Sequence, residues 1–407
     1  MKVLVINGDC VQVNSSANLC HIAYINGLIE SGHEVTLISA DGRDYELDPS
    51  IVIPEQVKQV TYYAVTLYEK LSLKKRTNSN REVKPITQGK AISNDNKSLR
   101  RIIIPKIKKM VVNSYGVHGI YSKFVKVASA YKDNTDYDCI ISVSTPPASH
   151  LLAYKLIKSG HIHGKRWIQI WEDPWYSDAY GYNRNKKIYR EERRLLELGN
   201  RICYVSPLTL ENQKRLYPQA AHKMYWQPLP YYYKSNTIKK QNFIDNKYGY
   251  FGNYLPEARN LEPFYRAAVQ EGVEVNICGE PGNLFSSTDK VKIYPRLTLQ
   301  ELKPIEDDTN VLVFLCNRKG GQIPGKIYQY AVTEKTILFI MDGTKEEQEE
   351  IYQFFSPYKR FVFCDNTQED IARAIREIEN NDYGDINNRP LEEFSPEAII
   401  KGILKGC

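Results

Sequence analysis

The sequence lacks any uninterrupted apolar run of about 18 residues, which is the length that usually crosses a bilayer as a helix. Its first apolar stretch, residues 3–6, gives way at once to polar residues and is too short for the apolar region of a signal peptide. These absences argue against a helical membrane protein. They predict that the chain is made in the cytosol and stays there.

Cysteine pairs with the spacing Cys-x-x-Cys are also absent. Eight cysteines occur singly along the chain, and several lie inside apolar stretches such as residues 139–141. Scattered cysteines of this kind are typical of buried, reduced thiols. We therefore expect neither a metal site nor a disulfide framework.

Acidic residues are scarce in one segment. Residues 69–109 hold thirteen lysines and arginines against three acids, a net charge of +10, whereas the whole chain carries +7. A local basic patch indicates an anionic partner for one face and argues against a general nucleic-acid-binding protein. Because residues 100–112 mix cations with bulky apolar side chains, residues 69–112 are a candidate contact with an anionic membrane surface. The protein would then be peripheral on the inner face of the membrane.

Short apolar runs alternate with helical patterns through both halves of the chain, which predicts parallel sheets built from strand–helix–strand units. The expected strands are 3–6, 35–38, 139–143, 167–171, 202–205 and 224–227, then 248–251, 273–278, 291–294, 311–315, 337–341 and 361–364. The expected helices include 148–158, 188–198, 261–270, 327–332 and 369–378, and Ser15 or Ser16 is the expected N-cap of a first helix that ends at Gly32. Two such series imply an α/β protein of two doubly wound, Rossmann-like domains that face each other across a cleft.

Glycine follows two strands of the second half directly. Gly252 and Asn253 follow the expected strand 248–251, and Gly279 and Glu280 follow the expected strand 273–278. A glycine at the carboxyl end of a parallel strand lets the backbone approach a phosphate or a nucleotide base, although either turn can be purely structural. These four residues are candidates for binding a nucleotide.

The third loop, residues 317–330, combines two glycines, a Pro-Gly step and three cations ahead of a helix. Flexible backbone, a helix N-terminus and positive charge together favour a diphosphate site. Lys326 and Gln329 lie about one turn apart on that helix, so the lysine could meet phosphate and the glutamine a ribose hydroxyl. The candidate binding residues of this loop are Lys319, Pro324, Gly325, Lys326, Ile327 and Gln329, together with Arg318.

The sequence Pro-Gly-Lys-Ile-Tyr-Gln-Tyr at 324–330 resembles the donor-binding helix of GT-B glycosyltransferases, especially the GT4-like group. The turns at 251–253 and 278–280, the Ser/Pro-rich segment 142–150, the Glu-Asp-Pro-Trp segment 172–175 and the residues 205–207 match further motifs of that group, in the same order. Two glutamates that the group carries eight positions apart are replaced here by Gly321 and Gln329. A neutral glutamine should bind a ribose hydroxyl less strongly than a carboxylate does.

The resemblance implies transfer of a sugar from a UDP- or GDP-linked donor, with no cofactor or metal and with retention of configuration. The acceptor would be a saccharide or a lipid-linked saccharide in cell-surface polysaccharide or glycoconjugate synthesis. Residues 1–230 would form the acceptor-side domain, with a basic insertion at about 69–130, and 231–247 the linker. Residues 248–385 would bind the donor, and 386–407 would form a tail able to cross back to the first domain.

Catalysis in such an enzyme needs positive charge at the leaving diphosphate, for which Arg318, Lys319 and Lys326 are candidates. Asp173 could face the acceptor and orient or deprotonate its hydroxyl, although an aspartate before proline often only caps a turn. His150 is a further candidate, although a single histidine on a helix is more often structural.

Three alternatives stay open. Asp41 follows the second strand, where a nicotinamide-dependent oxidoreductase carries its ribose-binding acid, but the loop at 8–13 lacks Gly-x-Gly-x-x-Gly. A sugar-nucleotide epimerase of the same fold would need acid–base carboxylates in the cleft. A non-catalytic sugar-nucleotide-binding protein is compatible with glutamine at position 329.

Overall fold

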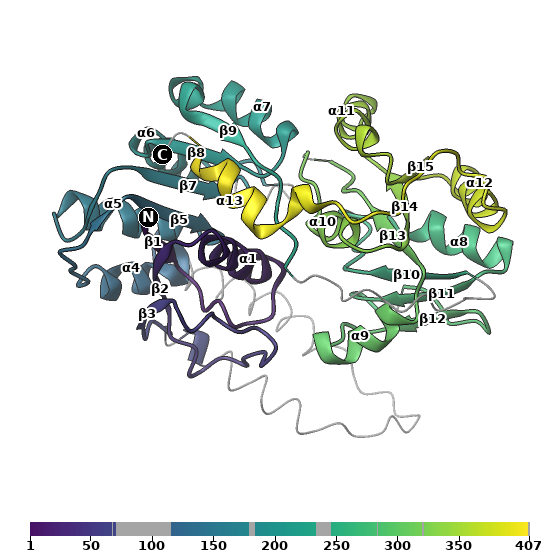
Figure 1. The fold of residues 1–407 in the computed structure, drawn as a ribbon, viewed down its shortest axis with the longest axis horizontal. Helices are drawn as coiled ribbons and strands as arrows, with labels where there is room; N and C mark the ends of the chain where they lie inside the picture. Colours follow the sequence, from purple (N-terminus) through teal and green to yellow (C-terminus); the bar gives the residue numbers. More distant parts are fainter. Residues whose placement is uncertain are drawn as a thin grey trace, which may run out of the picture.

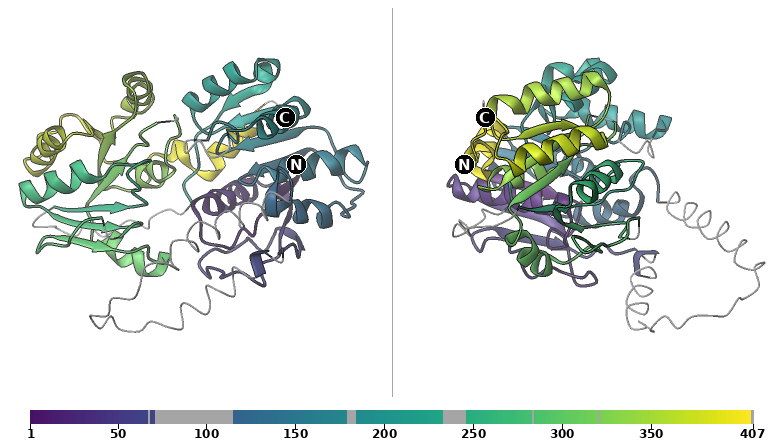
Figure 2. Two further views of the ribbon diagram at one scale, coloured as in Figure 1. Left: turned by 180° about the vertical axis from the view of Figure 1, so that it is seen from behind. Right: turned by 90° about the vertical axis from the view of Figure 1, so that its right-hand side faces the viewer.

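The computed structural model describes residues 1–66, 68–70, 115–178, 184–232, 246–282, 284–319 and 321–405. These residues form two lobes, each with a parallel sheet between helices (Figures 1 and 2). The prediction of two doubly wound, parallel-sheet domains is therefore confirmed. Most of the basic segment and of the expected linker lies outside the described residues.

The N-terminal sheet has seven parallel strands in the order β3-β2-β1-β5-β7-β8-β9. The chain winds outward from β1 to β3 and then in the other direction from β5 to β9, so the direction of winding switches between β1 and β5. A crevice opens at the carboxyl ends of strands at such a switch. The strands are β1 (Lys2–Asn7), β2 (Glu34–Ala40), β3 (Lys58–Tyr62), β5 (Cys139–Ser144), β7 (Trp167–Trp171), β8 (Arg201–Tyr204) and β9 (Met224–Trp226), and β4 (Asp136–Tyr137) pairs separately with β6 (His163–Gly164).

Helices cover both faces of this sheet because successive residues of each strand point to opposite sides. α1 packs on the face that carries Val5, whereas α4 and α5 pack on the face that carries Leu4. Buried Trp171 anchors α6 and α7 at the far end of the sheet. The helices are α1 (Ser16–Glu30), α4 (Ser122–Ala128), α5 (Ala148–Lys158), α6 (Lys186–Leu198) and α7 (Pro207–Leu216).

The C-terminal sheet has six parallel strands in the order β12-β11-β10-β13-β14-β15. α8 and α12 share one core with Tyr248 and Val313, and α10 and α11 pack on the opposite face with Phe314 and Phe339. The elements are β10 (Lys247–Phe251), α8 (Glu262–Glu271), β11 (Glu274–Cys278), β12 (Val291–Tyr294), α9 (Leu299–Asp307), β13 (Val311–Leu315), α10 (Lys326–Ala331), β14 (Thr336–Met341), α11 (Lys345–Phe355), β15 (Val362–Asp365) and α12 (Gln368–Glu379).

The seven cysteines in the described part of the chain are all free and buried, as the sequence predicts. Ser15 is the N-cap of α1, and its side chain accepts the backbone N–H of Asn18. No helix in the described ranges is both long enough and apolar enough to cross a membrane.

The last helix, α13 (Pro396–Leu404), packs against the first helix of the chain, α1 (Figure 1). Ile399, Ile400 and Ile403 are buried there in the same core as α1. The helices approach so closely at Gly27 that a methyl group would overlap the backbone carbonyl of Pro396. Residues beyond the C-terminal domain thus fasten it to the N-terminal domain.

We expect Gly27→Ala to lower the free energy of unfolding by about 1–3 kcal/mol, because its methyl group must push two backbones apart. The gain in helix propensity, about 1 kcal/mol, does not offset this cost. Gly402→Ala is the matched control on α13, since the atoms nearest to its methyl group belong to the side chain of Gln227, which can rotate away. Denaturant unfolding of both variants measures the difference. Equal stabilities would contradict this account of the helix contact.

Candidate active site

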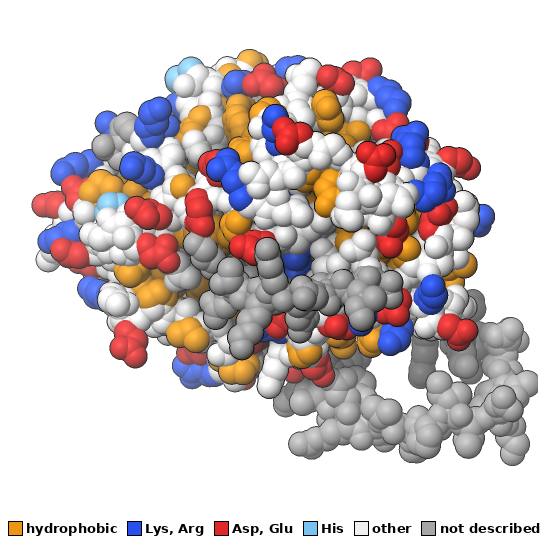
Figure 3. All heavy atoms as spheres, turned by 45° about the vertical axis from the view of Figure 1, so that its right-hand side comes forward, with side chains coloured by type: hydrophobic (Ala, Val, Ile, Leu, Met, Phe, Trp, Pro, Cys, Tyr) orange, Lys and Arg blue, Asp and Glu red, His pale blue; other side chains and the backbone are white. Residues whose placement is uncertain are grey.

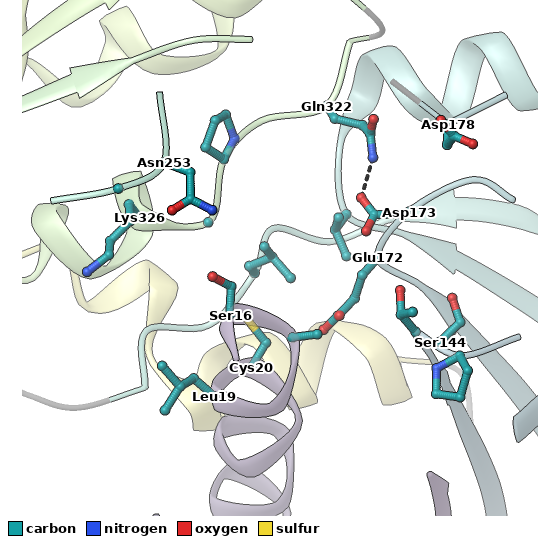
Figure 4. Close-up of a pocket in the computed structure, with 18 of the residues that line it drawn as sticks. Ser16, Leu19, Cys20, Ser144, Glu172, Asp173, Asp178, Asn253, Gln322 and Lys326 are labelled. Carbon is teal, nitrogen blue, oxygen red and sulfur yellow. Dashed lines mark hydrogen bonds between the residues drawn. The ribbon is translucent and has the colours of Figure 1, made fainter. Parts of the chain in front are cut away.

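A cleft of about 770 Å³ lies between the two domains, at the carboxyl ends of strands from both sheets. Its N-terminal wall comes from residues 117–121 and from α1, the end of β5 and the loop after β7, and Figure 4 shows labelled side chains of the last three. Its C-terminal wall comes from the loops after β10, β11, β12 and β13 and from the start of α10. The cleft therefore lies where two facing doubly wound sheets are expected to bind their ligands.

Two glycine turns, one after β10 and one after β11, form part of the C-terminal wall. Gly252 and Gly279 both line the cleft, and the turns pack so tightly that a methyl group on Gly279 would overlap the carbonyl of Gly252. Asn253 also lines the cleft, and its side-chain oxygen accepts the backbone N–H of Glu280 at 3.4 Å. Backbone without side chains therefore lines the cleft at these two turns. This is the property for which the two glycines were predicted to bind a nucleotide.

Three cations reach the same wall, namely Arg259, Arg296 and Lys326. Arg259 donates to Asn317 Oδ1 at 2.8 Å and to the carbonyl of Asn253 at 3.3 Å, and it forms no ion pair within the described ranges. Lys326 Nζ lies 3.6 Å from Glu306 Oε1. Burial alone would lower the pKa of Lys326, but the neighbouring phenols and Glu306 outweigh it and raise the pKa. The ammonium group is therefore charged.

Several predicted binding residues are not on the cleft surface. Arg318 and Lys319 are exposed, and Arg318 donates to the carbonyl of Pro256 at 3.0 Å. Ile327 is fully buried in the core. Gln329 is also buried, and its side-chain oxygen accepts the backbone N–H of Tyr232 at 3.1 Å. The expected placement of Arg318 at a diphosphate and of Gln329 at a ribose is therefore corrected: neither side chain, nor those of Lys319, Glu280 and Ile327, lines the cleft.

Asp173 lies at the edge of the N-terminal wall, next to the opposite domain. The side chain of Gln322 donates to its carboxylate across the cleft (Figure 4). Desolvation by the surrounding walls raises the pKa of Asp173, although the bond from Gln322 and the charge of Arg259 oppose this shift. Asp173 thus links the two walls.

Glu172 lies deeper than Asp173, at 8% exposure, and also lines the cleft. Its Oε2 lies 3.2 Å from His21 Nε2, and His21 Nδ1 lies 2.6 Å from the side-chain nitrogen of Asn7. Desolvation raises the pKa of Glu172, with His21 acting in the opposite direction. His21 lies on α1 and Glu172 follows β7, so only the fold brings these residues together.

Two further polar groups of the N-terminal wall are buried. The Oγ of Ser144, at the end of β5, has no hydrogen-bond partner in the described part of the chain, and neither has His118 Nδ1. His118 Nε2 lies 3.0 Å from Glu191 Oε1, and its ring packs on Trp175 with centroids 4.9 Å apart. Buried polar atoms are rarely left without partners, so this wall is suited to a ligand that offers hydroxyl groups.

His150, by contrast, does not line the cleft. Its Nδ1 lies 2.7 Å from Ser142 Oγ, and its ring packs on Trp171 with centroids 4.3 Å apart. Burial lowers the pKa of His150 to about 3, so the ring is neutral. His150 therefore contacts core residues and not the cleft, although its Nε2 has no hydrogen-bond partner among the described residues. Among the described residues, no group of histidine, cysteine or acidic side chains is arranged to hold a metal ion.

No protein-family model matches the sequence, and no curated protein matches it. Solved structures do match over the whole length. A sucrose-phosphate synthase from Thermosynechococcus elongatus aligns with 99% of this chain and 94% of its own, at 13% identity and a TM-score of 0.57. Spinosyn rhamnosyltransferase SpnG aligns with 100% of both chains at 12% identity and a TM-score of 0.47. A glycosyltransferase from Rickettsia africae aligns with 100% of this chain and 99% of its own, at 10% identity and a TM-score of 0.48.

The chain has the GT-B fold. Two facing parallel-sheet domains and full-length alignment with the sucrose-phosphate synthase establish this. Of the residues at the cleft, the sequence pointed to the glycine turns and the loop with Asp173, but not to Arg296 and His118, which also line it, nor to His21, which contacts Glu172. The one signal for His21 in the sequence is its place in α1, where a polar histidine stands next to the apolar residues Leu19 and Ile22.

A buried glutamate holds the loop that carries Asp173. Glu192 of α6 accepts the backbone N–H of Trp175 at 3.2 Å and of Tyr176 at 2.6 Å, and the hydroxyl of Tyr217 at 3.1 Å. Desolvation raises the pKa of Glu192 to about 7, although these three bonds oppose the shift. Glu192 therefore positions this part of the cleft wall.

We expect the stability of the wild type to rise, relative to Glu192→Gln, as the pH falls from about 7 to about 4.5. A carboxyl whose pKa is higher in the folded than in the unfolded state binds its proton more tightly when folded. Its contribution is therefore complete below the unfolded pKa and is lost as the pH rises through the folded pKa, a change of about 3 kcal/mol. Urea unfolding between these pH values tests this. Other carboxyls are common to both proteins, so parallel curves would contradict the shift.

Proposed function

We propose that the protein is a glycosyltransferase that moves a sugar from a nucleotide-sugar donor to a saccharide or a lipid-linked saccharide. The observation that carries the proposal is the contrast between the two walls of the cleft. Bare glycine backbone and cations form one wall, and buried hydroxyl, imidazole and carboxylate groups form the other. The first suits a diphosphate and the second suits a sugar.

The donor diphosphate would lie between the turns at Gly252 and Gly279 and the cations of the C-terminal wall. Negative charge grows on this group as the bond to the sugar breaks, and a positioned cation stabilises it. Arg259 and Lys326 are the residues we assign to this task. Arg259 replaces Arg318 in this role because its side chain lines the cleft.

The resemblance to GT4-like enzymes supports further details of the proposal. These are a UDP- or GDP-linked donor, retention of configuration, no metal requirement and a role in cell-surface polysaccharide or glycoconjugate synthesis. Attachment to the inner face of a membrane would rest on residues 69–112, of which 71–112 lie outside the described residues. On the face drawn in Figure 3, the described basic and acidic side chains are interspersed.

The direct test is a panel of UDP-glucose, UDP-galactose, UDP-N-acetylglucosamine, GDP-mannose and GDP-fucose. Thermal shift and calorimetry measure binding, and release of the nucleoside diphosphate measures turnover. A glycosyltransferase binds at least one of these compounds and releases its diphosphate. Binding without release would favour a sugar-nucleotide-binding protein, and release of an epimerised sugar nucleotide would favour an epimerase.

We expect Arg259→Ala to weaken binding of the panel's best donor by about 10- to 100-fold, because a charged hydrogen bond to phosphate contributes about 1.5–3 kcal/mol. Arg318→Ala is the matched control, since it removes a nearby arginine that does not line the cleft. It should change the dissociation constant by less than about 3-fold, as for most surface substitutions. Calorimetric titration gives both values. The reverse order of effects would return Arg318 to the donor site.

A further inference from the structure

Glu172 is the first residue after β7 and lines the cleft between the two domains. Only 8% of the residue is exposed. Its Oε1 has no hydrogen-bond partner among the described residues, whereas Oε2 is held by His21. A buried carboxylate with one oxygen unsatisfied is costly unless another molecule completes its hydrogen bonds. This points to a ligand group that donates a hydrogen bond.

The orientation of Glu172 is set by hydrogen bonds that run through the N-terminal domain. The backbone N–H of Asp9 donates to Asn7 Oδ1 at 2.9 Å, so the amide nitrogen of Asn7 faces His21 Nδ1 at 2.6 Å. That nitrogen donates, so His21 Nδ1 accepts and carries no proton. His21 therefore has its proton on Nε2 and donates it to Glu172 Oε2 at 3.2 Å. This series leaves Glu172 Oε1 as the carboxylate oxygen without a protein partner, in a residue that lines the cleft.

Asp173, the carboxylate that the sequence points to, is placed differently. In Figure 4 its side chain points to Gln322 of the opposite domain, whereas Glu172 points toward Cys20 on α1. Asp173 keeps exposed surface at the edge of the cleft, although the walls partly desolvate its carboxylate, and that carboxylate already accepts a hydrogen bond from protein. Of the two neighbouring carboxylates, Glu172 is the buried and rigidly held one.

We propose that Glu172 Oε1 accepts a hydrogen bond from the reacting hydroxyl of the acceptor, and that His21 and Asn7 are its positioning residues. This inference rests on the proposed glycosyltransferase function. The ionised carboxylate orients the hydroxyl hydrogen toward itself, which turns an oxygen lone pair toward the sugar of the donor. As the acceptor oxygen bonds to the anomeric carbon, the bond from that carbon to the diphosphate breaks, and the hydroxyl proton passes to the carboxylate. An ionised carboxylate only accepts hydrogen bonds, so the reacting atom must carry a hydrogen, as the oxygen of a sugar hydroxyl does.

The first test compares Glu172→Gln with Glu172→Asp in the hydrolysis of the panel donor that binds, a reaction in which water takes the place of the acceptor hydroxyl. Glu172→Gln keeps the shape of the side chain but loses its charge, and Glu172→Asp keeps the charge but withdraws it by one methylene group. We expect Glu172→Gln to lower diphosphate release by about 100-fold or more, the effect of losing a positioned acid–base group, with Glu172→Asp in between. The dissociation constant of the donor should stay within about 2-fold, because the substitution lies on the other wall.

The second test uses the pH profile, which a merely structural role would not move. Glu172 must be ionised, so turnover falls as the pH drops below its pKa. The ionisable groups that face it are His21, Cys20 and Tyr24 on α1 and the adjacent Asp173. Because His21 lowers the pKa of Glu172, His21→Met should move the acidic limb of kcat/KM to higher pH. His21→Gln can still donate to the carboxylate and should restore the limb toward its original position.

The outcomes separate this inference from the proposed function. If the wild type releases diphosphate and Glu172→Gln retains more than about a third of that rate, the assignment of Glu172 is wrong although the glycosyltransferase proposal stands. An unmoved acidic limb in His21→Met would contradict the positioning role of His21, even if Glu172→Gln proved too unstable to assay. A wild type that binds no donor of the panel would overturn both proposals. Loss of turnover with intact donor binding would support both.

Discussion

The contact between α13 and α1 is the constraint on which the cleft depends. Two parallel sheets can each form a crevice at their carboxyl ends, but a shared cleft requires these edges to face each other. The last helix of the chain provides this by burying Ile399, Ile400 and Ile403 against the N-terminal domain. Buried apolar contact of this extent is the dominant stabilising term between packed elements. The close approach at Gly27 then fixes how the two domains are oriented.

Polar contacts cross the cleft at its other side, and they differ in kind from this apolar contact. Ser206 Oγ, at the N-cap of α7, donates to the carbonyl of Gly321 at 2.7 Å, Gln322 donates to Asp173, and Arg296 donates to the carbonyl of Asn14 at 3.4 Å. Each such bond contributes about 1 kcal/mol and can be exchanged for a bond to water or to a ligand. The domains are therefore joined by fixed apolar packing at α13 and by exchangeable polar bonds across the cleft.

The sequence predicts the elements with a strong apolar signal and misses those without one. Strands 167–171, 291–294 and 311–315 are confirmed residue for residue. β7 and β13 are buried on both faces and therefore form largely apolar runs, whereas the edge strand β12 shows an alternation of Val291 and Ile293 with Lys292. α9 and α11 were missed because charged residues obscure their periodicity. Their capping boxes at Thr298 and Thr344 were the available signal. The edge strand β3 is largely polar and gives no comparable run.

The residues of the cleft are harder to predict than the strands, because a motif gives the position of a residue along the chain but not the direction of its side chain. The glycine turns were predictable, since bare backbone has no side chain to misplace. Arg318 and Gln329 lie in the right segment yet point elsewhere, and His21 reaches Glu172 across 151 positions of sequence. Two residues so far apart in the chain form no pattern that a short stretch of sequence could show. Only the positions of α1 and β7 in the folded domain bring them together.

Gln329 stands where GT4-like enzymes carry a glutamate, and its position in the fold explains the difference. Its side-chain oxygen accepts the backbone N–H of Tyr232, and Lys326, three residues earlier, is held by Glu306 and the phenol of Tyr232. Both side chains of α10 therefore hold the point where the chain leaves the N-terminal domain. A glutamine suits this task better than a glutamate, because a second buried charge would lack a cationic partner of its own. A ligand that contacts Pro324, Gly325 or Lys326 consequently acts on the same short helix that fixes the connection between the domains.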